Sequence, residues 1–160
     1  MRPMFALFVL VIVTGCGVPA PTTKSVTACN PTQPNGDTPS GEEAAPGFYG
    51  NGRLYTSGLS HNGIRADPGS VAADGSIGLK FAWWRALGVG AAGDLQIVGH
   101  ELNTNATIVA TIPDGYDQYF QATGITFPTE GCYEITARSG DAALTFVVKV
   151  VKVSSPAPSV

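Results

Sequence analysis

Residues 127–153, which read FPTEGCYEITARSGDAALTFVVKVVKV, decide the fold class of this chain. On each side of the turn sequence at residues 139–141, apolar residues occupy every second position, as in a strand with one face buried. We therefore predict a β-hairpin that closes the domain. The residues expected to face inward are Tyr133, Ile135 and Ala137 in the first strand and Leu144, Phe146, Val148 and Val150 in the second.

Tyr133 has a second possible role. A Gly followed by a strand of the form x-Tyr-x-Ile-x-Ala resembles the penultimate strand of many immunoglobulin-like domains. In those domains a tyrosine near the strand start hydrogen-bonds back to a loop through its hydroxyl. Tyr133 is either such a tyrosine or a plain core aromatic.

Turn residues cut the rest of the domain into short segments. The chain has 20 Gly and 12 Pro among its 160 residues, which favours many turns over long helices. The clearest further strand spans residues 77–84, where Ile77, Leu79, Phe81 and Trp83 are expected to face inward. Weaker strands are predicted at residues 53–56, 95–101, 107–112 and 120–127.

About seven short strands without helical periodicity predict an all-β fold. We expect an immunoglobulin-like antiparallel β-sandwich over residues 47–153, with a β-barrel as the alternative.

The N-terminus has the features of an export signal. Arg2 is followed by an unbroken apolar run at residues 5–13, which is too short for a membrane-spanning helix of about 20 residues. Val13-Thr14-Gly15-Cys16 resembles the lipobox of bacterial lipoproteins. This resemblance implies a signal peptide at residues 1–15 and lipid chains on the Cys16 thiol, which anchor the protein in the bilayer. An ordinary secretory signal with a free Cys16 is the alternative.

An acylated Cys16 would place the protein on the extracytoplasmic side of the cell membrane, or in the outer membrane of a bacterium that has one.

Residues 16–46 are expected to form a tether. Residues 17–46 contain six Pro and five Thr but no aromatic residue, Leu or Ile. Such a stretch buries too little apolar surface to offset the entropy of ordering, so we predict a flexible stalk. Residues 154–160, SSPAPSV, are predicted to be a disordered tail.

The three cysteines divide unequally. If Cys16 carries lipid, Cys29 and Cys132 remain as a pair that an oxidising compartment would allow to form a disulfide. Cys132 alternates with the inward-facing Tyr133, so this bond would hold the tether against the outside of the sheet. It would close a loop of roughly 100 residues, a constraint worth about 4.7 kcal/mol. Two unpaired thiols are the alternative.

Several segments together resemble an uncharacterised family of bacterial lipoproteins and secreted proteins. They are NGRLY at residues 51–55, DGSIG at 74–78, KFAWWR at 80–85, IPDGY at 112–116 and FPTEGC at 127–132. The resemblance spans most of residues 48–153 and implies a β-sandwich and an exported location. Members similarly carry a Cys shortly before the domain, which supports the Cys29–Cys132 pairing. The resemblance implies no activity and no catalytic residues.

The sequence motifs predict no cofactor. Residues 88–93, GVGAAG, match the G-x-G-x-x-G pattern, but a strand-like segment follows them where a dinucleotide site needs a helix. We expect an inter-strand loop there. Residues 58–62, GLSHN, lack the second Gly of a nucleophile elbow, so we expect no serine catalysis.

No metal site is predicted either. His61 and His100 lie far apart in the sequence without the paired spacing of zinc ligands. Four aspartates in turn sequences are expected to bond to the backbone rather than to calcium: Asp67, Asp74, Asp114 and Asp117.

One surface contact site is predicted around Trp84. Because Trp83 is expected to face inward, Trp84 is expected to face outward. Trp84 and Arg85, with Tyr116, Tyr119 and the adjoining Phe120, would then stack a sugar ring or bind a partner. In the alternative, the tether or the loop at residues 88–93 covers Trp84 and the residue serves packing.

The sequence therefore predicts a lipid-anchored envelope protein whose β-sandwich acts in interaction or structure and has no catalytic activity. Its partners are expected to be the lipid bilayer, through Cys16, and an envelope protein or glycan. The net charge of −3 argues against nucleic acid. A small-ligand or glycan-binding module at Trp84, Arg85 and residues 116–120 is the first alternative function, and an envelope hydrolase is the second.

Overall fold

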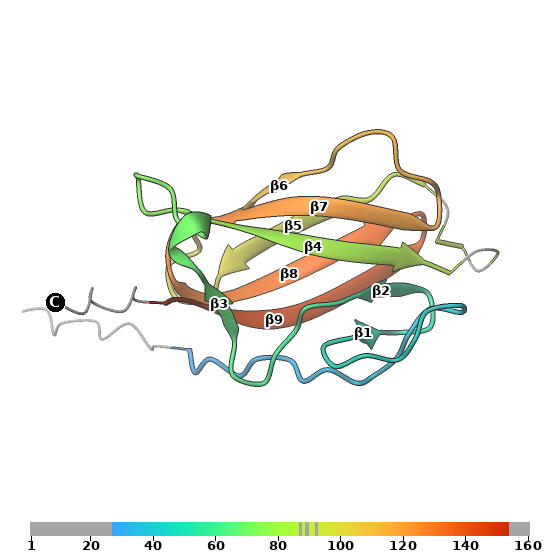
Figure 1. Ribbon diagram of the computed structural model, residues 1–160, viewed down its shortest axis with the longest axis horizontal. Coiled ribbons are helices and arrows are strands. Elements are labelled where there is room, and N and C mark those ends of the chain that lie inside the picture. Colours follow the sequence, from blue (N-terminus) through green and yellow to red (C-terminus); the bar gives the residue numbers. More distant parts are fainter. Residues whose placement is uncertain (1–26, 87, 89, 92, 154–160) are drawn as a thin grey trace, which may run out of the picture.

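Alternating apolar residues build two β-sheets that pack face to face as a sandwich (Figure 1). The structure is a computed structural model that describes residues 27–86, 88, 90–91 and 93–153. One sheet has the strand order β1-β2-β4-β7-β6 and the other the order β3-β9-β8-β5. The strands are β1 (Tyr49–Gly50), β2 (Leu54–Thr56), β3 (Ile64–Ala66), β4 (Ile77–Arg85), β5 (Gln96–Glu101), β6 (Val109–Thr111), β7 (Phe120–Phe127), β8 (Gly131–Ser139) and β9 (Ala142–Lys152).

The all-β sandwich predicted from the sequence is confirmed, and each of the seven predicted strands is present. The two further strands, β1 and β3, have two and three residues, too short to show alternation. One pairing departs from the predicted antiparallel pattern. β3 runs parallel to β9, with Ile64 opposite Val150, because the chain crosses to the second sheet only briefly between β2 and β4.

The predicted closing hairpin is β8 and β9, and its inward-facing residues are all buried. The core between the sheets centres on four aromatic residues that are no more than 2% exposed: Trp83, Phe127, Tyr133 and Phe146. The Tyr133 hydroxyl donates to the carbonyl oxygen of Thr129 at 2.8 Å. Its ring also packs edge-on against Phe127 at 4.9 Å. Both roles considered for Tyr133 are therefore present in one residue.

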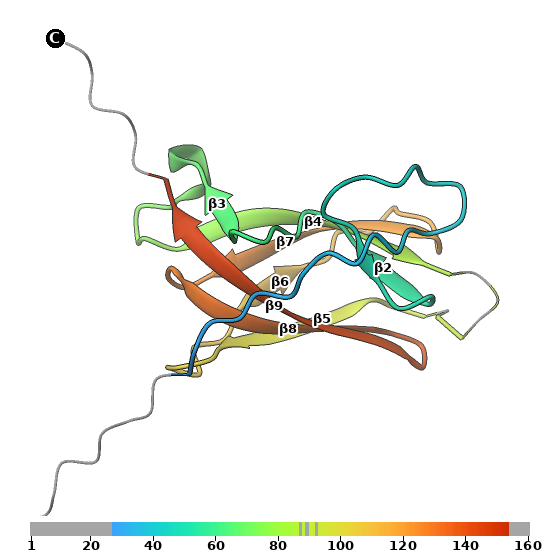
Figure 2. The ribbon, with the colours of Figure 1, turned by 90° about the horizontal axis from the view of Figure 1, so that it is seen from below.

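Residues 27–46, here called the strap, differ from the predicted flexible tether. They run along the open side of the sandwich beside β9 and then loop over β2 (Figure 2). The Thr32 N–H donates to the Val147 carbonyl, and the Thr32 hydroxyl accepts from the Val147 N–H, both at 2.8 Å. The Asn35 side chain bonds to both the N–H and the carbonyl of Gly50. These bonds satisfy edge-strand groups, which orders a segment that has little apolar surface.

The predicted disulfide is present. Cys29 of the strap is bonded to Cys132 at the start of β8, with a Cα–Cα distance of 5.6 Å. Cys132 is buried on the outer face of its sheet, beneath the strap. The bond therefore fixes the beginning of the strap to one end of the sandwich.

The sandwich has two distinct ends, at the left and right of Figure 1. The disulfide end holds Cys29, the start of β8 and the end of β9. The loop end holds the end of β4, the start of β7 and the segment before β5. Antiparallel pairing of β5 with β8 and of β4 with β7 places these two sets a full strand length apart.

Several predictions fall on residues that the structure does not describe. They are the signal peptide at residues 1–15, the acylated Cys16 and the tail at residues 154–160. The loop at residues 88–93 is described only in part. Within the described ranges, no helix is long and apolar enough to span a bilayer.

Candidate functional site

Trp84 and Arg85 do not form one site, because successive residues of β4 point to opposite faces of the sheet. Trp84 lies on the outer face and is 8% exposed. It packs between Phe48 and Phe120, with ring centroids 5.1 and 5.3 Å away. Its indole Nε1 donates to the Glu42 carboxylate at 3.1 Å. The strap therefore covers Trp84, as in the packing alternative.

Trp84 belongs to an aromatic row that crosses three strands. Tyr55 of β2 and Phe120 of β7 are its register partners on either side. Tyr119 closes the row by donating its hydroxyl to the Ser40 carbonyl at 2.8 Å. Burial and the nearby Glu42 raise the pKa of Tyr119. Trp84 and Tyr119, both predicted as surface contacts, thus serve to hold the strap.

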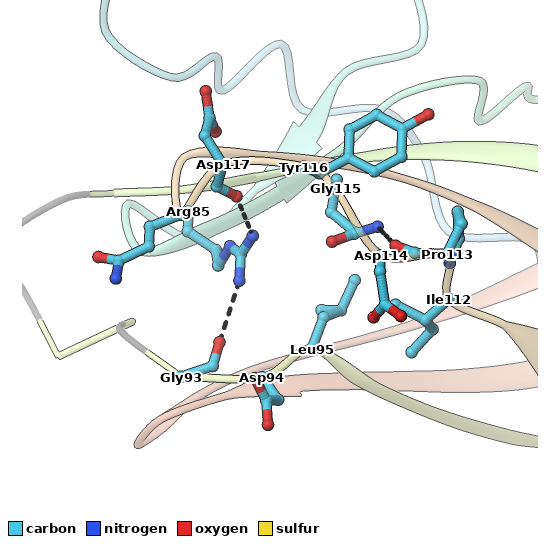
Figure 3. Close-up of a pocket in the computed structure, with 12 residues that line it drawn as sticks. Arg85, Gly93, Asp94, Leu95, Ile112, Pro113, Asp114, Gly115, Tyr116 and Asp117 are labelled. Carbon is cyan, nitrogen blue, oxygen red and sulfur yellow. Dashed lines mark hydrogen bonds between the residues drawn. The ribbon is translucent and has the colours of Figure 1, made fainter.

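Arg85, in contrast, faces the space between the sheets at the loop end. It lines a pocket of about 360 Å³ (Figure 3). Nη1 donates to the Gly93 carbonyl at 3.0 Å, and Nη2 donates to the Asp117 carbonyl at 2.8 Å. Gly93 precedes β5 of one sheet and Asp117 precedes β7 of the other. The guanidinium therefore bridges the two sheets at their open end.

The Arg85 charge has no carboxylate partner within the described part of the chain. The residue is only 6% exposed, and its Nε has no hydrogen-bond partner. The single ion pair among the described residues joins Arg53 to Asp141. Figure 3 shows the carboxylates of Asp94 and Asp117 pointing away from the guanidinium. Buried charges are normally paired, so this arrangement is unusual.

The Asp117 carboxylate is used by its own loop. It accepts hydrogen bonds from the backbone N–H groups of Phe120 and Tyr119 at 2.7 and 2.8 Å. These bonds hold the pKa of Asp117 below its ordinary value, and the nearby Arg85 contributes to the same effect. Asp117 therefore bonds to the backbone of its turn, as predicted.

Tyr116 and Asp114 lie in the same loop with different surroundings. Tyr116 is 44% exposed and packs edge-on against Phe120, and its ring points away from the Arg85 guanidinium (Figure 3). Asp114 lies across the pocket from Arg85, beside Ile112, and its carboxylate is exposed. Of the four predicted contact residues, the structure brings Arg85 and Tyr116 to the pocket and leaves Trp84 and Tyr119 beneath the strap.

Gln121, which the sequence did not single out, is the second buried polar residue of the pocket. It is 7% exposed, and its Nε2 donates to the Pro113 carbonyl at 2.9 Å. Its Oε1 accepts no hydrogen bond from the described residues, and this oxygen is not fully buried. This oxygen is therefore open to the pocket as a free acceptor.

The other candidate residues lie apart from this pocket. His61 is exposed in the turn after Ser60, whose hydroxyl accepts from the Asn62 N–H at 3.3 Å. His100 is on edge strand β5. Glu101 beside it is 5% exposed, and hydrogen bonds from Thr104 and Asn103 outweigh the effect of burial and lower its pKa. Over the described ranges, no three His, Cys, Asp or Glu residues group as a metal site.

Fold and site together define a β-sandwich domain that is joined to the strap by a disulfide and has a small polar pocket at the loop end. Comparison of the chain with protein-family models gives no match, and comparison with curated proteins gives none. The resemblance to uncharacterised bacterial lipoproteins therefore stays a prediction.

Proposed function

We propose that this protein is a lipid-anchored cell-envelope protein and that its β-sandwich is a non-catalytic binding module. The observation that carries the proposal is that the disulfide and the pocket lie at opposite ends of the domain. The chain that leads from Cys16 joins the sandwich at the disulfide end, and the pocket with Arg85 opens at the loop end. Anchoring at the first end directs the second end away from the membrane.

The length of the connecting chain limits the distance between this end and the anchor. Only 12 residues lie between Cys16 and Cys29, so the disulfide end lies within about 45 Å of an acylated Cys16 even if that chain is fully extended. The disulfide itself supports an oxidising, extracytoplasmic location.

The anchor is tested by replacing the acylated thiol. We expect Cys16→Ser to move the protein from the membrane fraction to the soluble fraction of a bacterial host, because the thiol that carries the acyl chains is gone. Cys29→Ser is the matched control and should stay with the membranes, since it removes a thiol that carries no lipid. A Cys16→Ser protein that sediments with membranes as the parent does would contradict the proposal.

Binding of a small ligand at the loop end is the more specific form of this function. The unpaired Arg85 favours it, because a buried guanidinium in a pocket wall is suited to meet a ligand acceptor. The Trp84 surface is a weaker candidate, since Glu42 of the strap accepts its indole N–H and the rings of Phe48 and Phe120 pack against it.

A further inference from the structure

We propose that the loop-end pocket binds a small zwitterion of the α-amino acid type, with its carboxylate on Arg85 and its ammonium toward Asp114 and Gln121. The proposal deepens the binding function above by naming a ligand class. It rests on the pocket and is independent of the lipid anchor.

Arg85 supplies the carboxylate site. Each of its two Nη atoms carries two N–H groups, and the carbonyls of Gly93 and Asp117 take one from each. One N–H on each Nη therefore remains as a donor for a ligand carboxylate, a group whose two oxygens a guanidinium can bind together. The two carbonyls also hold the guanidinium in place before a ligand arrives, which lowers the cost of binding.

The charges near Arg85 disfavour a simple anion. Asp94, Asp114 and Asp117 all line the same pocket, so three carboxylates accompany one guanidinium, although those of Asp94 and Asp117 point away from it. A phosphate or a dicarboxylate would add negative charge to a region that already has an excess of it. A ligand that also carries a positive group removes this repulsion.

Two acceptors are placed for that positive group. The exposed Asp114 carboxylate makes no hydrogen bond to the described residues, and the Gln121 Oε1 is free. An ammonium has three donors and no acceptor, so it pairs with both of these oxygens. Arg85 of β4 and Gln121 of β7 lie on adjacent strands of one sheet, and Asp114 lines the same pocket, so the carboxylate and the neighbouring ammonium of one small ligand can be bound together.

The remaining wall is apolar. Leu95 is 5% exposed and lies with Ile112 and Pro113 on the inner side of the pocket. The cavity of about 360 Å³ is near the lower limit of ligand pockets, which selects a short ligand. An amino acid with an aliphatic side chain therefore fits both the polar and the apolar groups.

Calorimetric titration of the full chain in mild detergent tests the ligand class. Leucine, as either enantiomer, is compared with isocaproate, which lacks the ammonium, and with isoamylamine, which lacks the carboxylate. We expect saturable binding of leucine and at least tenfold weaker binding of both single-charge analogues. Absence of leucine binding, or equal binding of leucine and isocaproate, would overturn the proposal.

Two variants assign the groups. Arg85→Lys should weaken leucine binding at least tenfold, because an ammonium cannot bond to both carbonyls and still offer a fork. Asp114→Asn changes an exposed side chain and should keep the melting temperature while reducing the preference for leucine over isocaproate about tenfold. This second variant decides the matter if Arg85→Lys does not fold. Asp67→Asn, an exposed aspartate beside η1 (Pro68–Ser70), is the control and should bind leucine normally.

Unchanged leucine binding in Asp114→Asn would disprove the ammonium assignment. A failure of leucine binding together with intact membrane attachment of the parent protein would disprove the ligand class and leave the anchor proposal standing.

Discussion

Trp83 and Trp84 are neighbours in the sequence and lie in two different layers of the molecule. Trp83 is fully buried between the sheets, where its Nε1 bonds to the Thr123 hydroxyl at 3.0 Å and its ring packs on Phe146. Trp84 is buried on the outer face, where its cover comes from Phe48, Phe120 and the strap. The first layer is held by hydrophobic packing of strands. The second is held by hydrogen bonds, a disulfide and a short row of aromatic rings.

This difference shows how a polar, Pro-rich segment becomes ordered without a core of its own. Its side chains take the place of a strand at the open edge of the sandwich, as Asn35 does for Gly50. The disulfide at Cys29 limits the freedom that the segment would regain on leaving the surface.

Removing Trp83 should give the largest effect. We expect Trp83→Ala to lower the free energy of unfolding by about 3–5 kcal/mol, because it leaves a cavity in the centre of the core. Trp84→Ala is the matched variant and should cost less, about 2 kcal/mol, since the strap can close over the gap. Urea unfolding followed by far-UV circular dichroism gives both values. An equal or larger loss for Trp84→Ala would refute the distinction between the layers.

The disulfide should have the next largest effect. The double variant Cys29→Ser with Cys132→Ser is expected to lose about 2–5 kcal/mol of stability, because the unfolded chain is no longer closed into a loop. The strap should also loosen, so quenching by acrylamide should reach Trp84 and still not reach Trp83. Fluorescence of this double variant carrying Trp83→Phe or Trp84→Phe separates the two signals. Unaltered quenching at Trp84 would show that the strap stays in place without the bond.

A single strap contact should give the smallest effect. Asn35→Ala removes both bonds to Gly50 and is expected to cost about 1 kcal/mol. Gln33→Ala is the control, because Gln33 is exposed and its amide bonds only to the nearby Pro31 carbonyl. Thermal unfolding compares the two variants. A loss in Gln33→Ala as large as in Asn35→Ala would argue against edge pairing by Asn35.

The sequence predicts the inner layer well because alternation of apolar residues within a single strand identifies the side chains that face the core. Alternation in β4, β8 and β9 assigns Phe81, Trp83, Tyr133 and Phe146 to the core. The outer layer escapes this kind of prediction, because its contacts join residues far apart, such as Thr32 with Val147. The cysteine count and the family resemblance indicated that the strap and the domain are joined, and a tether over Trp84 was predicted only as an alternative.

Arg85 shows a different limit. Its position gives it the same orientation as Trp83, so alternation alone places it inward. The predicted surface site instead grouped Arg85 with the neighbouring Trp84. The structure reconciles the two because Arg85 lies at the last position of β4, where the space between the sheets opens to a pocket. Gln121 occupies a similar position at the start of β7, and its orientation in an alternating strand was the signal available for it.

The Cys29–Cys132 bond also determines how the molecule would respond to mechanical force. A pull on the chain that precedes Cys29 passes through the disulfide into the start of β8, which is hydrogen-bonded to β9 on one side and to β5 on the other. Residues 30–46 lie outside this path. β8, one of the two inner strands of its sheet, would bear the load, and the cover over Trp84 would be bypassed.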